Sequence, residues 1–344
     1  MVMIGIDAHK RTHTVVVVDE RGRQLAQRTT GTRSSDHLEL VAWAARHGQH
    51  VWAVEDCRHL SRRLERDLLA AGERILRVPP KLMANARDGA RSFGKSDPID
   101  ALAVARAALR EPDLPLARLD GPEREVRLLV DHREDLVQER TRIISRLRWH
   151  LHELDPAGGP VPRSLNHLRN LDLLAKRLAG VEGTVARIAR DLIERCRSLT
   201  IAITQLEREI SQLIEQLATA LLAICGCGPL TAAKILGETA GIERFKSPDA
   251  YARHNGTAPL PVWSSNRARH RLSRTGNRQL NAAIHRIALT QARHHPPAQA
   301  MLARRRAGGD GGLEALRVLK RRLSDIVYAA LREDLTVTVQ PVAA

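Results

Sequence analysis

Four acidic residues of this 344-residue chain have the types and spacing of a metal-binding group, and they are Asp7, Glu55, Asp97 and Asp100. Asp7 ends the apolar run 3–7, and Glu55 ends the similar run 51–55. Asp97 and Asp100 are three residues apart at the start of an expected helix, so they share one of its faces. Acids from separate elements repel each other unless a cation lies between them, and carboxylate oxygens suit Mg²⁺ or Mn²⁺. The pattern favours metal-assisted chemistry on a phosphodiester.

A structural explanation exists for each acid alone. Asp7 and Glu55 can be strand-end residues at turns, and Asp97 followed by Pro98 fits a helix N-cap with proline at the first helical position. Together they favour a site, because the order of strands and the helix spacing bring them to one edge of a sheet. His9 and His13 lie close to Asp7 in the sequence and are candidates for substrate contact, although exposed strand-edge histidines are commoner.

A pair of serines, Ser264 and Ser265, is the second feature with chemical potential. The pair lies in an expected loop over residues 259–267, where most serines are solvated, so spacing alone gives little support for a nucleophile. The surroundings do suit phosphodiester chemistry. A metal or a nearby base would have to activate the hydroxyl. Four basic side chains are available to bind the phosphate, namely Arg267, Arg269, Arg271 and Arg274.

The elements that must position the acids alternate between strand and helix in the N-terminal third. We expect strands at residues 4–7, 12–18, 24–29, 51–55 and 74–78, and helices at 35–47, 60–71 and 97–109. A three-stranded meander followed by alternating helix and strand describes an α/β domain of the ribonuclease-H type. In such a domain the first and fourth strands are neighbours, and both present acids from their ends.

The rest of the chain is expected to be helical after a linker at residues 112–122. A long helix ends at the glycine- and proline-rich stretch 155–160, and residues 199–217 carry an alternating 4-3 apolar seam. That seam needs a partner, and an intramolecular hairpin is favoured over a second subunit. The expected domains are a catalytic domain (1–115), a helical coiled-coil region (120–218) and a mainly helical C-terminal domain (219–335).

Residues 224–233 have the pattern of a helix-hairpin-helix turn at the start of the C-terminal domain. Gly226 and Gly228 would leave backbone N–H groups open at a helix start, where phosphate binds well. Further helices are expected at 278–292 and 313–331.

Composition limits the partners. A net charge of +16 and a pI near 10.8 indicate an anionic partner, with nucleic acid first and a membrane surface second. An aromatic content of 2% disfavours binding mainly by base stacking. No apolar run approaches the roughly 20 residues that span a bilayer, so we expect a cytoplasmic protein, associated with the nucleoid when bound to DNA. The four cysteines lack zinc-ligand spacing and suggest no disulfide framework.

The combination of motifs resembles the insertion sequence one-ten (IS110) family of DEDD transposases. The N-terminal resemblance rests on residues 5–10 (GIDAHK), 54–55 (VE) and 95–101 (KSDPIDA). The C-terminal resemblance rests on residues 225–229 (CGCGP), 255–259 (NGTAP) and 273–278 (SRTGNR). These motifs extend over nearly the whole chain in the family's order.

The resemblance implies a RuvC-like domain, a coiled-coil region and a C-terminal transposase domain with a catalytic serine. Carried over by position, Mg²⁺ (or Mn²⁺) would be held by Asp7, Glu55, Asp97 and Asp100, and Ser264 would be the nucleophile that forms a covalent phosphoserine link. Contacts to nucleic acid are then expected from Gly226, Gly228, Arg267, Arg269, Arg271, Arg274, Asn277 and Arg278.

The implied partners are double-stranded DNA (target and element ends), a structured guide RNA encoded by the element, and further copies of the chain in a homodimer or homotetramer. One position departs from the family, which has Ser-Gly where this chain has Ser264-Ser265, so Ser265 stays a possible substitute. Two alternatives remain: a RuvC-like Mg²⁺-dependent nuclease that uses water, and a non-catalytic nucleic-acid-binding protein.

Overall fold

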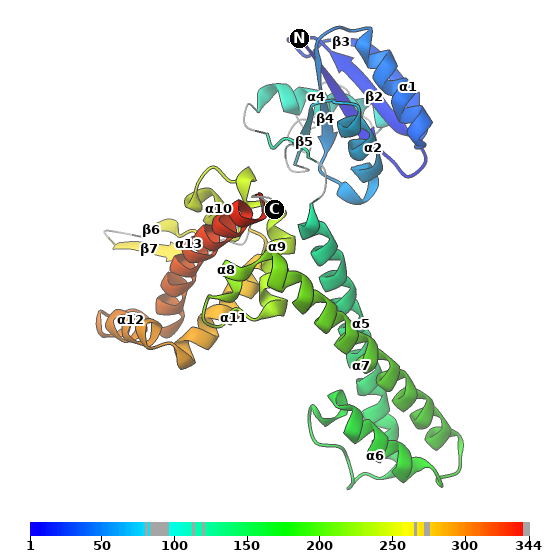
Figure 1. Ribbon diagram of the computed structural model, residues 1–344, viewed down its shortest axis with the longest axis vertical. Coiled ribbons are helices and arrows are strands. Elements are labelled where there is room, and N and C mark those ends of the chain that lie inside the picture. The colour runs from blue at the N-terminus through cyan, green and yellow to red at the C-terminus, as the bar shows by residue number, and fades with distance from the viewer. Residues whose placement is uncertain are drawn as a thin grey trace, which may run out of the picture. The chain divides into compact units, whose positions relative to one another are not determined.

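The chain divides into two compact units, Met1–Asp120 and Gly121–Ala344 (Figure 1). The computed structural model describes residues 1–79, 82, 96–111, 114–118, 121–264, 267–271 and 276–339. The first unit holds a five-stranded sheet with helices, and the second is mainly helical. The expected division into three domains stays a prediction.

The sheet of the first unit has the strand order β3-β2-β1-β4-β5. Its strands are β1 (Val2–Ala8), β2 (His13–Val18), β3 (Gln24–Thr30), β4 (His50–Glu55) and β5 (Ile75–Val78). The first three strands form an antiparallel meander, while β4 pairs parallel with β1 and β5 pairs parallel with β4. This is the ribonuclease-H-like, RuvC-like arrangement expected from the sequence, with β1 and β4 as neighbours.

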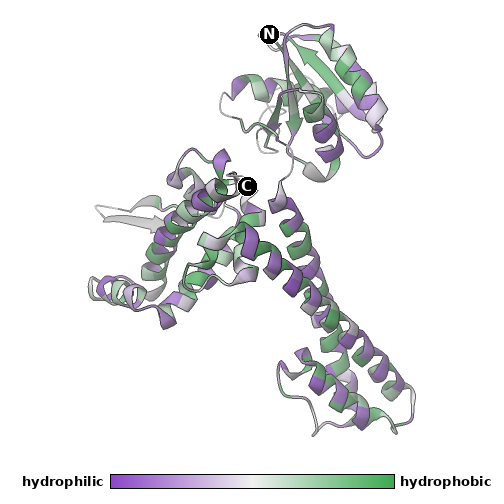
Figure 2. Ribbon diagram, in the orientation of Figure 1, coloured by the Kyte–Doolittle hydropathy of each residue, from purple (hydrophilic) through white to green (hydrophobic). Residues whose placement is uncertain are grey.

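Helices cover both faces of this sheet, which explains why its central strands are continuous apolar runs. Even-numbered residues such as Ile4, Ile6 and Trp52 pack in the core that includes residues of α1 (Ser34–Ala45) and α2 (Arg58–Ala70). Odd-numbered residues such as Met3, Val51 and Ala53 pack against α4 (Asp97–Arg110). Figure 2 shows the hydrophobic residues concentrated in the strands, between the more polar outer surfaces of the helices.

Gly5 lets α4 lie directly on the backbone of β1. A Cβ atom at this position would lie 2.2 Å from the carbonyl oxygen of Ala101 and 2.6 Å from the amide nitrogen of Ala105. The helix presents small side chains to the sheet, so the two backbones approach closely. The distance between β1 and α4 is therefore set by the absence of a side chain at Gly5.

The second unit begins with an antiparallel helical arm. Its long helices are α5 (Pro122–Leu154) and α7 (Thr184–Leu217), with α6 (Leu168–Leu178) and a short 3-10 turn (Ser164–Asn166) between them (Figure 1). Helix α5 ends just before the expected break. The seam of α7 faces α5 in the same chain, which confirms the intramolecular hairpin. Figure 2 shows apolar and polar residues alternating along both helices.

The remainder of the second unit is a helical core with one small hairpin. Its elements are α8 (Thr219–Leu222), α9 (Pro229–Thr239), a 3-10 turn (Ile242–Arg244), α10 (Pro248–His254), β6 (Leu260–Ser264), β7 (Arg267–Arg271), α11 (Arg278–His294), α12 (Pro296–Ala307) and α13 (Gly312–Val339). Tyr251 is fully buried among α9, α10 and α13, and its ring contacts Phe245 and Tyr328. Of the described helices, none is long and apolar enough to cross a membrane.

A charge cluster fastens the arm to this core. The ammonium group of Lys234 on α9 is buried and lies 2.9 Å from Glu134 and 3.3 Å from Asp131, both on α5. Glu238, one turn along α9, lies 3.7 Å from the same ammonium group and 3.7 Å from Arg127 of α5. One buried cation is thus shared among carboxylates from two helices, and the cluster links the start of the arm to α9.

Candidate active site

Asp7 and Glu55 end adjacent parallel strands on the same face of the sheet. The register pairs Ile6 with Val54, and its continuation by one residue places Asp7 beside Glu55. Both are odd-numbered, so they follow Met3 and Ala53 toward the side that α4 covers. Asp7 is 7% exposed and Glu55 is half-buried.

Helix α4 delivers the other two acids. Asp97 is its first residue and is exposed, whereas Asp100 is 7% exposed. Ser96 is the N-cap residue, so the alternative interpretation of Asp97 as a helix cap is wrong by one position. The reason is that the carbonyl oxygen of Ser96 already accepts the N–H groups of Ile99 and Asp100. Asp97 is thereby left free of a capping role, and two acids in the first turn also interact favourably with the helix dipole.

His9 connects the strand acid to the helix acid. Its Nε2 atom lies 3.0 Å from Asp7 Oδ2 and 3.4 Å from Asp97 Oδ1. One ligand atom from each of Asp7, His9 and Asp97 falls within 4.8 Å of the other two. The sequence suggested His9 only as a candidate for substrate contact and did not predict that it joins the acids. His9 follows the end of β1 at Ala8, two residues after Asp7, and this closeness in the sequence is the signal.

The electrostatics of Asp7 reflect this crowding. Burial raises the pKa of the Asp7 carboxyl above its ordinary value, nearby His9 lowers that pKa, and the charges of Asp100 and Asp97 raise it again. The carboxylates from β1 and α4 therefore act on one another across a short gap. A cation between them would remove the repulsion that raises the pKa.

Cys57 follows Glu55 closely and takes no part in this group as a thiolate. Burial, together with the negative charges of Glu55 and Asp7, raises the pKa of the Cys57 thiol to about 11. His13, in contrast to its expected exposure, is buried on the other face of the sheet. Its ring lies 5.3 Å from that of His37, and it does not reach the acids.

Ser264 lies in a β-hairpin, so the sequence prediction of a loop over residues 259–267 is wrong for most of that segment. Strands β6 and β7 are antiparallel, and the register pairs Ser264 with Arg267. Arginine occupies every second position of β7, at 267, 269 and 271. Ser265 and Arg274 lie outside the described residues. Cross-strand pairing thus outweighs the low strand propensity of Pro261 and the polar residues.

The remaining candidates for nucleic-acid contact lie at helix starts. Gly226 has φ +87°, a left-handed conformation that favours glycine, and Gly228 is the exposed N-cap residue of α9. Asn277 caps α11: its Oδ1 accepts the N–H groups of Gln279 and Leu280, and its Nδ2 donates to Glu238 at 2.8 Å. Asn277 therefore has a structural role in the free protein. Arg278 is exposed beside it.

Two family models match the chain. The model for DEDD transposases of IS110, described as a transposase, matches residues 4–156, and the model for the transposase family IS116/IS110/IS902 matches residues 218–303. The first contains all four acids and the second contains Ser264.

Curated relatives extend over nearly the full length. A 44.8 kDa protein of insertion element IS116 from Streptomyces clavuligerus is 27% identical, covering 99% of this chain and 97% of the relative. A 42 kDa protein of insertion element IS900 from Mycobacterium paratuberculosis is 28% identical, covering 96% of each chain. A solved structure of Thermus thermophilus RuvC with a Holliday junction substrate is 18% identical with a TM-score of 0.25, covering 32% of this chain and 94% of that one.

The two family models together match more than half of the residues, in the order in which their motifs occur along the chain. The full-length likeness to insertion-element proteins agrees with them. This chain belongs to the IS110 family of transposases and carries its RuvC-like DEDD domain at the N-terminus.

Proposed function

We propose that this transposase cuts and rejoins DNA strands with a group of metal-binding carboxylates and a serine nucleophile. The observation that carries the proposal is the convergence of acids from β1, β4 and α4 on one face of the sheet. Asp7 and Asp97 lie within reach of one His9 nitrogen, and the charge of Asp100 acts on Asp7. Such a group suits hard divalent cations.

The donor set fits Mg²⁺ or Mn²⁺. Asp7, Asp97, Asp100 and Glu55 supply carboxylate oxygens, which both ions accept. His9 adds a nitrogen that Mn²⁺ tolerates better than Mg²⁺ does. When bound, the metal would polarise a phosphoryl oxygen and stabilise the charge that develops on it. Asp7 would hold the ion from the strand side and Asp97 from the helix side.

Ser264 supplies the nucleophile in this proposal. Its Oγ attacks phosphorus and loses its proton to a base, the Oγ–P bond forms, and the P–O bond to one side of the DNA strand breaks. The leaving oxygen takes up a proton. A hydroxyl of a second strand then displaces Oγ, which restores the serine and joins the new pair of strands. The arginines of β7 would hold the phosphate oxygens during both steps.

A denaturation-resistant protein–DNA link is the measurement that tests this. Ser264→Ala should abolish the link and leave DNA binding intact. Asp7→Asn should abolish both the link and the cleavage, since the acids are needed whether serine or water attacks the phosphate. Cleavage without any link in the unaltered protein would instead indicate a nuclease that uses water. A link that persists in Ser264→Ala and vanishes in Ser265→Ala would move the nucleophile by one residue.

The proposal includes a guide RNA from the element and a homodimer or homotetramer. Support for an RNA partner is the excess of positive charge, +16, over the whole chain. Purification with and without the non-coding end of the element tests both points. A discrete RNA that co-purifies, and that changes the mass of the particle in light scattering, is the expected result. Full DNA exchange by RNA-free protein would refute the guide.

A further inference from the structure

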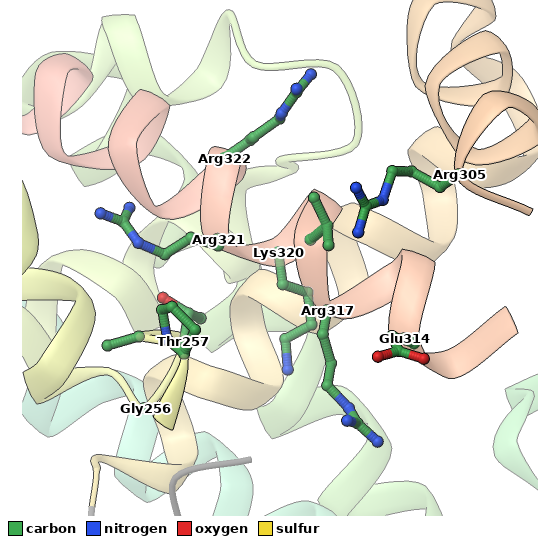
Figure 3. A pocket seen from close by; sticks show the side chains of 11 residues that line it. Gly256, Thr257, Arg305, Glu314, Arg317, Lys320, Arg321 and Arg322 are labelled. Carbon is green, nitrogen blue, oxygen red and sulfur yellow. The ribbon is translucent and has the colours of Figure 1, made fainter. Parts of the chain in front are cut away.

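A basic cavity lies beside the segment that leads into the serine hairpin. Its volume is about 380 Å³, and it lies between the turn after α10 and helices α12 and α13 (Figure 3). Gly256, Thr257, Ala258 and Pro259 form one wall. The opposite lining carries one acid, Glu314, and the basic residues Arg305, Arg317, Lys320, Arg321 and Arg322. The excess of positive charge favours an anionic occupant.

Lys320 is the unusual member of this lining. It is 7% exposed, and its ammonium group donates to the neutral amide oxygen of Asn281 at 2.5 Å. Among the described residues, no carboxylate pairs with it. Burial lowers the pKa of Lys320, and the neighbouring charge of Arg317 lowers it further. A buried ammonium group without a counter-charge costs free energy, and an anion in the cavity would offset that cost.

Two other cations of the lining, Arg321 and Arg305, differ from Lys320 because their partners are carboxylates. Arg321 pairs with Asp249 at 2.5 Å and with Asp325, and Arg305 pairs with Asp310. These ion pairs hold two guanidinium groups in place at the edge of the cavity. Lys320 is therefore the buried cation of the described lining whose hydrogen-bond partner is neutral, and exposed Arg317 lies one turn before it on α13.

Lys320 is also connected by hydrogen bonds to the segment that precedes the β6–β7 hairpin. Its partner Asn281 donates through Nδ2 to the backbone carbonyl of Asn255 at 2.9 Å, and Asn255 in turn donates to Ser324 of α13. The strand β6 starts one residue after Pro259 and ends at Ser264. At about 3.3 Å per residue, the chain from Pro259 to Ser264 extends over roughly 17 Å.

We propose that this cavity binds a backbone phosphate of the DNA strand on which Ser264 acts. A phosphodiester would place anionic oxygens beside the buried ammonium group of Lys320 and near Arg317, and it would do so whatever the base sequence. A span of roughly 17 Å corresponds to about five nucleotides at 3.4 Å each, so the bound phosphate lies within about that distance of the scissile one. The position relative to the cut rests on the proposed function, whereas the phosphate contact does not.

Equilibrium binding tests the contact in a Ser264→Ala background, where no chemistry intervenes. Lys320→Met and Arg317→Gln should each weaken binding of duplex DNA several-fold at low salt, for any base sequence. Each should also lower the slope of log affinity against log salt by about 0.9. Arg332→Gln, the same change at an exposed arginine of the same helix outside the cavity, is the control and should leave both quantities unaltered.

A neutral methylphosphonate moved along the strand then locates the phosphate. In the protein with Lys320 intact, one position within about five nucleotides of the cut should reduce affinity, and in Lys320→Met the same position should have no further effect. Equal affinities for both cavity variants and the control would overturn the proposal, as would a loss confined to RNA of the same sequence. Since Arg317 is exposed, Arg317→Gln keeps the test valid if Lys320→Met fails to fold.

If the cavity variants lose affinity but no serine link ever forms, the proposed function fails and the phosphate contact stands. If the link forms at its usual rate with saturating DNA and affinity is unchanged, the contact fails and the proposed function stands.

Discussion

Replacing Gly5 with alanine is the most direct test of how the acidic group is assembled. The added Cβ would lie 2.2 Å from the Ala101 carbonyl oxygen and 2.6 Å from the Ala105 amide nitrogen. A carbon–oxygen contact in packed protein is about 3.3 Å or more, so α4 must move away from β1 by about 1 Å. Both contacted atoms belong to the helix backbone, and no side-chain rotation relieves them.

The displaced helix carries Asp97 and Asp100 away from Asp7. Metal–ligand distances tolerate only about 0.2 Å, and a misplacement of 1 Å in an active site costs about 100-fold in rate. Overpacking of this kind destabilises by about 1–3 kcal/mol. We therefore expect Gly5→Ala to leave a folded protein with a lower Tm, about 100-fold less DNA cleavage, and a weaker rise in Tm on addition of Mn²⁺.

The control is Gly180→Ala, since a Cβ at Gly180 meets no atom within 4 Å and its φ is not positive. Circular dichroism melts with and without Mn²⁺, and cleavage at saturating DNA, are the assays. Cleavage by Gly5→Ala within a few-fold of the unaltered protein would refute the reasoning, because the helix position would then not set the acid geometry.

Three further outcomes follow from contacts described above. Burial lowers the pKa of His13 from 6.5 to about 4, so the folded state favours neutral His13. The resulting contribution to the free energy of unfolding is complete above pH 6.5 and is lost as the pH falls toward 4. The loss is about 3 kcal/mol at most. Urea unfolding measured from pH 7 to pH 4 should show that loss of unfolding free energy, and His13→Leu should make the dependence on pH less steep. An equally steep dependence in the variant would assign the loss to other groups. Lys234→Met leaves Glu238, Glu134 and Asp131 without their shared cation, and it should lower the free energy of unfolding in urea by about 2–3 kcal/mol. This is less than for a fully buried pair because Asp131 is half-exposed. An unchanged unfolding midpoint would show that the cluster does not stabilise the contact between the arm and α9. Asn277→Ala should lower the free energy of unfolding by about 1 kcal/mol through loss of the α11 cap. The control for DNA binding is a second cap variant, Ser247→Ala on α10. A larger fall in DNA affinity for Asn277→Ala than for Ser247→Ala would indicate that Asn277 also contacts nucleic acid directly.

Much of the first unit was predictable because its signals are local and agree with one another. The run 3–7 and the run 51–55 are apolar at every position before the acid, as strands covered on both faces must be. Strand alternation then places Asp7 and Glu55 on one face. The pairing of α5 with α7 could also be predicted, since the 4-3 seam has to be buried and an earlier stretch of the same chain carries apolar residues at similar spacings.

The parts that could not be predicted depend on contacts between distant residues. The closeness of α4 to β1 rests on Gly5 meeting Ala101 and Ala105, which no local pattern shows. The hairpin of β6 and β7 arises from cross-strand pairing around a proline, against its propensity. His9 required knowledge that Asp97 returns to the same edge. Lys320 lies in a run of three basic residues, 320–322, and nothing in that run shows that the fold buries the first of them.

The length of the helical arm of the second unit also has a consequence for spacing. Helix α5 has 33 residues, so at 1.5 Å per residue it is about 50 Å long. The Lys234 cluster locks its first turns to α9, and the packed seam of α7 stiffens the rest. A rigid rod of that length equals roughly 15 base pairs of DNA at 3.4 Å each. A ligand bound at the far end of the arm would be held at a fixed spacing from the C-terminal core. A rotation of one degree at the base of the arm would move that far end by about 0.9 Å.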